Sequence, residues 1–167
     1  PIHSGGPRLS LWPGPAQDAA MPRPCFIVHD LAQGRAALAA ATEARLAVVL
    51  ASAPGAAGYL GAGYWRALED LWRAEFPETE FLALLDCGDA PGDALAALRA
   101  GVKALRLDGP SEVVAKVAAI AEAEGVAVDP EAGPACDLGT LQDPRGAARD
   151  HLAHWDADGV EKGVGPG

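Results

Sequence analysis

The chain has 167 residues, half of them hydrophobic, which is enough for one globular domain with a sizeable core. Its formal net charge of -10 argues against a nucleic-acid partner, because binding to phosphates needs a surface rich in lysine and arginine. The longest apolar runs, such as LAVVLASA, fall far short of the roughly 18 to 20 residues that cross a bilayer, so no membrane partner is expected.

The N-terminal twenty residues are rich in proline and glycine, and we expect them to form an irregular arm. Met21 follows directly, and we interpret it as the natural start, with residues 1–20 as upstream or added sequence. No basic segment precedes an apolar core, so a secretory signal is not expected. Three widely spaced cysteines fit neither a metal pair nor a disulfide framework, which favours a reducing compartment. We therefore predict a cytoplasmic protein.

Between residues 21 and 129, short apolar runs alternate with helical periodicity, as is typical of strand and helix units around a parallel sheet. The expected strands are residues 25–28, 47–51, 80–85, 103–107 and 126–128. The expected helices are residues 31–45, a helix from 59 or 64 to 76, 92–100 and 111–124. The predicted fold class is α/β, a single-domain three-layer sandwich with a mostly parallel sheet of about five strands. Residues 130–167 read as an acidic, turn-rich tail with a short helix at 144–155.

Four of the expected strands lead directly into aspartate, at Asp30, Asp86, Asp108 and Asp129. The carboxyl ends of parallel strands meet at one edge of a sheet, and that edge is where such folds hold ligands. Aspartate before a helix is also the ordinary N-cap residue. We expect Asp30 to cap its helix, with Gln33 completing a capping box, Asp108 to act mainly as a cap and Asp129 to lead into a turn.

The loop at residues 86–89 is then the strongest candidate site, with His29 opposite it. Two carboxylates in one pocket push their pKa values apart, so that one serves as acid and the other as base. Asp86, Asp89 and His29 are therefore the candidate catalytic residues. Asp86 and Asp89 are also candidate ligands of a hard divalent cation such as Mg²⁺, which prefers oxygen. Flanking aspartates raise the pKa of the Cys87 thiol, which argues against a nucleophilic cysteine.

A glycine-rich loop at residues 55–63 follows the second expected strand. Such a loop can present backbone N–H groups to a phosphate, although its spacing matches neither the dinucleotide fingerprint nor the P-loop. A flexible lid or a packing loop is the alternative. The candidate ligand-binding residues at this edge are Ser52, Gly55, Gly58, Tyr59, Cys87 and Asp108.

The stretch from Leu46 to Glu122 resembles the second half of a response-regulator receiver domain. The resemblance lies in the buried strand, in PGAAGYLGAGYWRALEDL and in ALRAGVKALRLDGPSEVVAKVAAI. It implies a flavodoxin-like topology. Receivers carry a phosphoacceptor aspartate where this chain has Ser52, and a lysine where Asp108 and Gly109 precede Pro110, so phosphoryl transfer is not expected.

The sequence thus predicts a noncatalytic binding or interaction module, a degenerate receiver. Its expected partner is itself or another protein, through the alanine-rich first helix or a face formed by Trp65 and Trp72, with a small molecule left open as a ligand. The alternative is a small metal-assisted or acid/base enzyme whose site is the acidic edge of the sheet. The enzyme requires Asp86, Asp89 and His29 to lie within about 5 Å of one another, close enough to shift each other's pKa.

Overall fold

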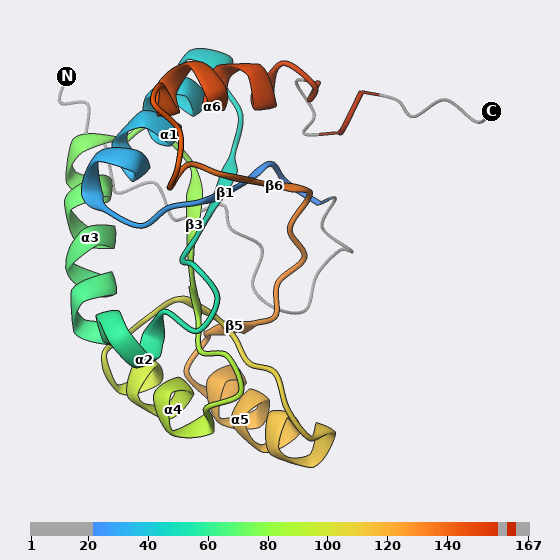
Figure 1. Cartoon of the computed structure of the whole chain (residues 1–167). Coiled ribbons are helices and arrows are strands. Elements are labelled where there is room, and N and C mark those ends of the chain that lie inside the picture. The colour runs from blue at the N-terminus through green and yellow to red at the C-terminus, as the bar shows by residue number, and fades with distance from the viewer. Residues whose placement is uncertain (1–21, 157–159, 163–167) are drawn as a thin grey trace, which may run out of the picture.

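The computed structural model describes residues 22–156 and 160–162. The expected N-terminal arm and Met21 lie outside the described residues. The strands are β1 (Cys25–Ile27), β2 (Val48–Ala51), β3 (Phe81–Asp86), β4 (Ala104–Arg106), β5 (Ala127–Val128) and β6 (Ala135–Asp137). The helices are α1 (Leu31–Ala44), α2 (Ala57–Leu60), α3 (Ala62–Glu75), α4 (Pro91–Arg99), α5 (Ser111–Ala123) and α6 (Pro144–Leu152) (Figure 1).

All six strands form one parallel sheet, in the order β5-β4-β3-β2-β1-β6. The predicted α/β class is confirmed, as is a mostly parallel sheet. The five expected strands are present, and β6 adds a sixth from the segment that the sequence presents as a tail. In the described part of the chain, no helix is long and apolar enough to cross a membrane.

The strand order corrects the flavodoxin-like prediction. In the flavodoxin-like order β1 lies between β2 and β3, whereas here β2 lies between β1 and β3. Each of the first four strands pairs with the next one along the chain, as successive strands do in a (β/α)₈ barrel. The lone departure is β6, which returns to the opposite edge and pairs with β1.

The helices lie on one face of the sheet, so the predicted three-layer sandwich is wrong for the described residues. One core cluster combines alternate strand residues such as Phe26, Leu50 and Leu105 with residues from all six helices. The other face carries a second buried cluster, made of Cys25, Val49, Ala51, Leu82, Leu84 and Ala104, to which no helix contributes. When the chain always adds the next strand on the same side, right-handed crossovers place every helix on the same face.

We infer that the sheet is curved from the short link between its two edge strands, β5 and β6, which has only residues 129–134. In a flat sheet the five intervening spacings would separate these strands by about 24 Å. A fully extended link of this length reaches only about 24 Å, and it must also pass from the carboxyl end of β5 to the amino end of β6. The link therefore crosses the concave, helix-free face, where Ala132 packs against the second cluster (Figure 1).

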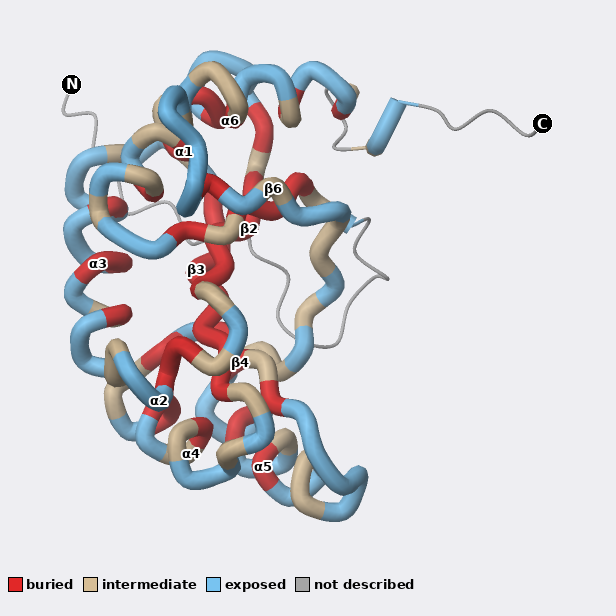
Figure 2. Tube along the Cα trace, in the orientation of Figure 1, coloured by how far each residue is buried: buried red, intermediate tan, exposed pale blue. Residues whose placement is uncertain are grey.

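Local signals in the sequence explain how the helices begin and pack. The Asp30 side chain caps α1 by accepting a hydrogen bond from the Gln33 N–H at 2.8 Å, as predicted. A Cβ atom at Gly34 would come within 2.2 Å of the Trp72 ring, so this glycine lets α1 and α3 approach closely. Trp65 and Trp72 are fully buried, as the burial map in Figure 2 shows for α3, and they therefore cannot form the exposed self-association face that was predicted.

Candidate functional site

Three charged side chains gather on the concave face where three neighbouring strands, β3, β4 and β5, end. Leu84 and Ala104 belong to the second buried cluster, on the concave face. Because side chains alternate along a strand, Asp86 and Arg106, each two residues further on, point to the same face. Asp86 and Arg106 are also direct partners in the register of β3 and β4. Asp129, just beyond β5, completes this group, which we call the carboxyl-edge cluster.

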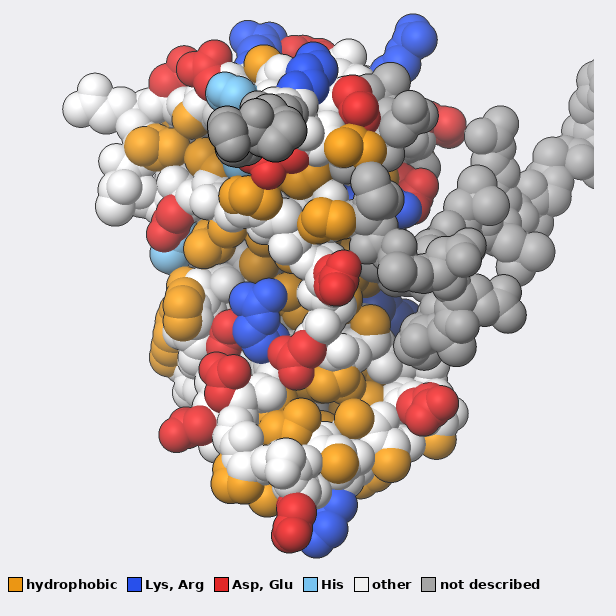
Figure 3. Space-filling view, turned by 90° about the vertical axis from the view of Figure 1, so that its right-hand side faces the viewer, with side chains coloured by type: hydrophobic (Ala, Val, Ile, Leu, Met, Phe, Trp, Pro, Cys, Tyr) orange, Lys and Arg blue, Asp and Glu red, His pale blue; other side chains and the backbone are white. Residues whose placement is uncertain are grey.

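Arg106 lies between the two carboxylates without a close hydrogen bond to either. Its Nη1 is 3.9 Å from Asp86 Oδ2, and its Nε is 4.0 Å from Asp129 Oδ1. Its side chain is 39% exposed, so the guanidinium can reach a ligand. Figure 3 shows acidic and basic side chains together in the middle of a face that also carries apolar patches. The two carboxylates thus keep the positively charged Arg106 side chain at the open edge of the sheet.

Asp129 is in an unusual state for both its backbone and its carboxyl group. Its φ is 46°, in the left-handed region that few non-glycine residues adopt and that is enriched at functional sites. Burial raises its pKa, the negative charges of Asp108 and Asp86 add to the increase, and the Leu107 N–H and Arg106 oppose it. A carboxyl group with a raised pKa is better suited to exchanging protons near neutral pH.

Asp86 is held by the backbone of two loops. Its Oδ1 accepts hydrogen bonds from the N–H groups of Gly55 and Gly88, both at 2.8 Å. Its own N–H donates to the hydroxyl of the buried Ser52 at 2.9 Å. Asp86 and Ser52 therefore fasten the glycine-rich loop to the end of β3, and Asp86 Oδ2 is the oxygen that faces Arg106.

His29 does not join Asp86 and Asp89 but pairs with Asp137 of β6. Its Nε2 lies 2.8 Å from Asp137 Oδ1, and the same oxygen accepts the Gly139 N–H at 2.8 Å. Since β2 separates β1 from β3, His29 and Asp86 are two strand spacings apart, or about 10 Å. The close group of three that the sequence suggested is thus replaced by two separate groups on one edge.

The remaining predicted site residues occupy different surroundings. Asp89 is exposed and makes no hydrogen bond or ion pair with any described residue. Cys87 faces the helix-side core, where burial first, and then the charges of Asp86, Asp93 and Asp129, raise its pKa to about 12. Asp108 is exposed, and α5 has no side-chain cap, so the expected cap does not form.

The glycine-rich loop contains the short helix α2 and breaks at Gly61, whose φ is 80°. Gly55 uses its N–H on Asp86, so that donor is not free to hold a phosphate. Gly58 lies against Asp93, where a Cβ would come within 3.3 Å of a carboxylate oxygen. Tyr59 is 66% exposed. The loop therefore packs against the acidic edge, with Tyr59 as its exposed aromatic side chain.

A divalent cation at Asp86 and Asp89 remains a prediction. Among the residues that the structure describes, no group of three or more His, Cys, Asp or Glu side chains is arranged to hold a metal ion. Asp86 Oδ1 already accepts two N–H donors, and Oδ2 faces Arg106 Nη1 at 3.9 Å, so a cation at Asp86 would have to compete with Arg106 for Oδ2.

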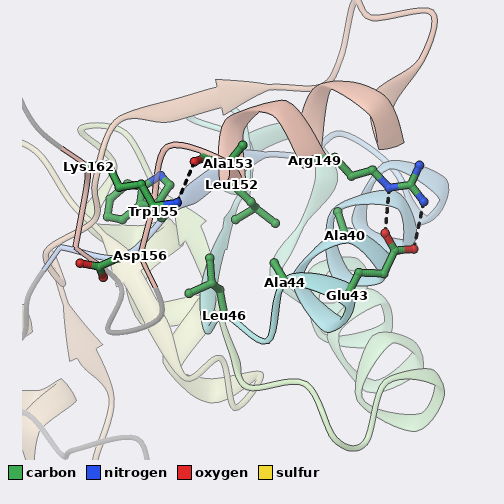
Figure 4. Close-up of a pocket in the computed structure, with 10 residues that line it drawn as sticks. All are labelled: Ala40, Glu43, Ala44, Leu46, Arg149, Leu152, Ala153, Trp155, Asp156 and Lys162. Carbon is green, nitrogen blue, oxygen red and sulfur yellow. Dashed lines mark hydrogen bonds and ion pairs between the residues drawn. The ribbon is translucent and has the colours of Figure 1, made fainter.

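A separate pocket of about 390 Å³ lies between α1 and α6, away from the carboxyl edge (Figure 4). Leu46 and Ala44 place it near the amino ends of the strands. Its floor is apolar, with Leu152 and the buried Trp155, and an ion pair between Glu43 and Arg149 closes one end. The pocket contains none of the predicted site residues.

Sequence reasoning missed Arg106, the role of Asp129 and the partner of His29. An arginine inside the otherwise apolar run ALRL was the available signal for the first, since a cation in a buried strand usually has a partner or a function. Asp129 resembled an ordinary turn residue before Pro130. Asp137 is 108 positions from His29, and no local pattern links them.

No family model matches the chain. Two of its curated relatives are fructose-bisphosphate aldolases, one from Xanthobacter flavus, 30% identical over 149 residues, and one from a Nostoc species, 32% identical over 141 residues. These alignments cover 81% and 76% of this chain but only 41% and 38% of the relatives, so the chain spans about two fifths of their length. A candidate fructose-1,6-biphosphate aldolase structure from Coccidioides immitis superposes with a TM-score of 0.53 at 18% identity, over 65% of this chain and 45% of that one.

These similarities overturn two predictions. The chain is not a receiver, since both its relatives and its strand order point to an aldolase-like fold. The noncatalytic module is also wrong, because the relatives are named as enzymes, and the alternative of an acid/base or metal-assisted enzyme at the acidic edge is the better supported. The chain is similar in sequence to a part of fructose-bisphosphate aldolases, and similar in fold to a part of the solved structure.

Proposed function

We propose that the carboxyl-edge cluster performs aldolase-type acid/base chemistry on a small, negatively charged carbonyl compound. The observation that carries this proposal is the exposed Arg106 guanidinium held about 4 Å from both carboxylates, beside the raised pKa of Asp129. The similarity to fructose-bisphosphate aldolases supplies the reaction type. The chain spans only about two fifths of those relatives, so the proposal rests on the residues of this edge and not on the relatives' complete active site.

Aldol cleavage needs a proton acceptor and a cation. The acceptor removes the proton of a hydroxyl group, whose oxygen becomes a new carbonyl as the neighbouring carbon–carbon bond breaks. The electron pair of that bond moves into the existing carbonyl and forms an enolate, whose negative oxygen a cation stabilises. The enolate carbon then takes back a proton, so that one substrate yields two carbonyl products.

The cluster offers a residue for each of these needs. Asp129 exchanges the proton, because its raised pKa brings it closer to neutral pH than an ordinary carboxyl. Arg106 faces the oxygen that becomes negative, and it has no hydrogen bond in the described part of the chain to compete with a ligand. Asp86 orients Arg106 and fixes the glycine-rich loop.

The test is an assay of fructose 1,6-bisphosphate cleavage, in which the release of three-carbon phosphates is measured. Asp129→Asn should lower kcat by about 100-fold or more, since removing a general acid/base costs about 10² to 10⁴. Asparagine also tolerates the left-handed backbone, so this change isolates the carboxylate. Arg106→Met should lower kcat as well.

Asp89→Asn is the matched control, because Asp89 is an exposed carboxylate on the same edge without a partner among the described residues. Its activity should stay within about twofold of the wild type, as is usual for a surface change away from a site. Full activity in Asp129→Asn, or no cleavage by the wild-type chain, would contradict the proposal. Self-association and a cytoplasmic location remain predictions.

A further inference from the structure

The pocket between α1 and α6 lies at the opposite end of α1 from the carboxyl edge. This helix begins after Asp30, where β1 ends, and its 14 residues span about 21 Å along the axis. Its last residue, Ala44, lines the pocket. The pocket is therefore separate from the carboxyl-edge cluster and from His29 with its partner Asp137.

Small side chains leave the space of this pocket open. Ala40 and Ala44 lie one turn apart on α1, and Ala153 follows the end of α6. Because a methyl group fills little of the gap between two packed helices, a hollow of about 390 Å³ remains. Sites for small molecules have volumes of roughly 300 to 1,000 Å³, so this pocket has room for one.

The floor of the pocket is apolar and held in place. Leu46, Leu152 and Trp155 form it, and all three side chains are buried. A Cβ atom at Gly133 would collide with the Trp155 ring, and the His151 ring packs edge-on against the same indole, with 6.3 Å between the centroids. A floor that is already ordered costs little entropy when an apolar group binds to it.

A lysine stands at one end of this floor. An antiparallel bridge between Trp155 and Glu161 brings the following residue, Lys162, back over the end of α6. Lys162 Nζ donates to the Ala153 carbonyl at 3.3 Å and has no ion pair with any described residue. An ammonium group has three N–H donors, so Lys162 can also donate to a ligand. Figure 4 shows Lys162 beside Trp155 at one end of the pocket.

The charges around the pocket favour an anion. At the other end Glu43 pairs with both Arg145 and Arg149, so these three side chains carry one net positive charge. Asp156 is the remaining acidic residue of the lining, and its Oδ1 accepts the Val160 N–H at 2.8 Å. Its carboxylate points away from the apolar floor (Figure 4). With Lys162, the surroundings are positive on a chain whose net charge is -10.

We propose that this pocket binds a small carboxylate with an apolar body about the size of one ring. The body lies on Leu46, Leu152 and Trp155, and the carboxylate accepts hydrogen bonds from Lys162. An apolar lining with a few polar groups that fix the orientation of the ligand is typical of small-molecule sites. This site does not depend on the proposed function, since it shares no residue with the carboxyl-edge cluster.

The first test locates the binding of a probe, phenylacetate, to the full chain. In proton–nitrogen NMR, the indole N–H of Trp155 and the amides of Leu46 and Ala153 should shift as phenylacetate is added. The amides of Gly55 and Gly88, which contact Asp86, should not shift. No shift of the pocket signals at millimolar phenylacetate, or shifts at the carboxyl edge alone, would overturn the proposal.

The second test separates the charge from the shape of the probe. Lys162→Gln should raise the Kd of phenylacetate about fivefold, the upper end for an exposed ion pair, and should leave the Kd of the neutral phenylacetamide unchanged. Lys116→Gln removes the same charge from the exposed surface of α5 and is the matched control. Equal weakening of both probes by Lys162→Gln would contradict a hydrogen bond to the carboxylate.

The third test fills the pocket. Ala44→Phe places a ring where the probe binds, so the shift of the Trp155 indole should disappear. Ala115→Phe, at an exposed alanine of α5, is the matched control and should bind phenylacetate as the wild type does. Unchanged binding to Ala44→Phe would overturn the proposal. Thermal unfolding midpoints of Ala44→Phe and Lys162→Gln within a few degrees of the wild type show that lost binding is not a loss of fold.

Inorganic phosphate distinguishes a site for an apolar carboxylate from a site for any anion. Phosphate at the same concentration should not displace phenylacetate, because it has no apolar body to cover Leu46 and Trp155. Displacement by phosphate would show that the pocket recognises charge alone, which contradicts the proposed ligand class.

Discussion

At the scale of single residues, the aspartates at the strand ends perform different tasks. Asp30 caps a helix, Asp86 anchors two loops and Asp129 carries the raised pKa. Asp30 and Asp129 each accept one backbone N–H group, from Gln33 and Leu107, whereas Asp86 accepts two. Asp86 accepts two of them on one oxygen in a nearly buried position, so it has a structural role that does not depend on any substrate.

Asp86→Ala should therefore destabilise the chain, because it leaves the Gly55 and Gly88 N–H groups without their acceptor. We expect a loss of about 2 to 4 kcal/mol in the free energy of unfolding, typical for charged hydrogen bonds in a partly buried site. Urea denaturation measures it. Asp89→Ala should change the same quantity by less than about 0.5 kcal/mol. Equal effects of the two substitutions would contradict the anchoring role.

The sequence could indicate part of the site but not its geometry. Asp86 and His29 were identified because residues at the ends of parallel strands must share an edge. Their partners were not, because the neighbour of a strand end depends on the strand order and register. Asp137 comes beside His29 only when β6 pairs with β1, and Arg106 beside Asp86 only in the observed register of β3 and β4.

At the scale of elements, α1 and α6 form a close contact between distant parts of the chain. Glu43 of α1 pairs with both Arg145 and Arg149 of α6, and its Oε2 lies 2.8 Å from Arg149 Nε. Hydrogen bonds from Arg149 and then from Arg145 lower the pKa of Glu43 from 4.5 to about 2. The helices thus share an exposed ionic contact beside the pocket of Figure 4.

This contact predicts a specific dependence of stability on pH. A carboxyl whose folded pKa is depressed contributes stability that is present above its unfolded pKa, near 4.5, and is lost as pH falls through the folded value of about 2. Glu43→Gln should therefore lower the unfolding midpoint at pH 7, and its difference from the wild type should shrink between pH 4.5 and 2. Thermal unfolding across this range measures it.

The control is Glu122→Gln, which removes the same charge from the exposed surface of α5, where no described residue pairs with it. Its difference from the wild type should be small and nearly constant over this range of pH. Because the Glu43 contact is solvent-exposed, 1 M salt should also reduce the effect of Glu43→Gln at pH 7. A difference that persists unchanged at pH 2 would contradict the ionic origin.

At the scale of the whole molecule, local patterns predicted the elements better than their arrangement. Strands such as β2 and β3 are entirely buried, and their apolar runs show this in the sequence. By contrast, β6 has only the residues ACD, of which the two outer ones are exposed, so no hydrophobic run marks it. The strand order depends on the position at which each crossover returns to the sheet. A single sequence without a tandem repeat contains no local pattern that predicts this position.

The sequence predicts a domain at 21–129 and a tail at 130–167, and this division leaves out the contacts between the two segments. The segment after Asp129 crosses the concave face, adds β6 beside β1 and packs α6 against α1. Leu138, just after β6, is fully buried, and its N–H donates to the Ile27 carbonyl at 3.0 Å. Leu138 and the residues of β1 therefore belong to one core.

We predict from this that the tail unfolds together with the sheet, in one transition. Leu138→Ala should lower the free energy of global unfolding by about 2 to 5 kcal/mol, as expected for a large-to-small change in a core. Leu141→Ala, three residues on at a side chain that is 40% exposed, is the matched control and should cost less than about 1 kcal/mol. In native-state hydrogen exchange, the Leu138 amide and the Val28 amide, which donates to Ala51, should open with the same free energy. Two results would contradict this prediction: exchange of the Leu138 amide through a separate opening of lower free energy, and no effect of Leu138→Ala on the Val28 amide. They would show that the segment after Asp129 unfolds independently of the five-stranded sheet.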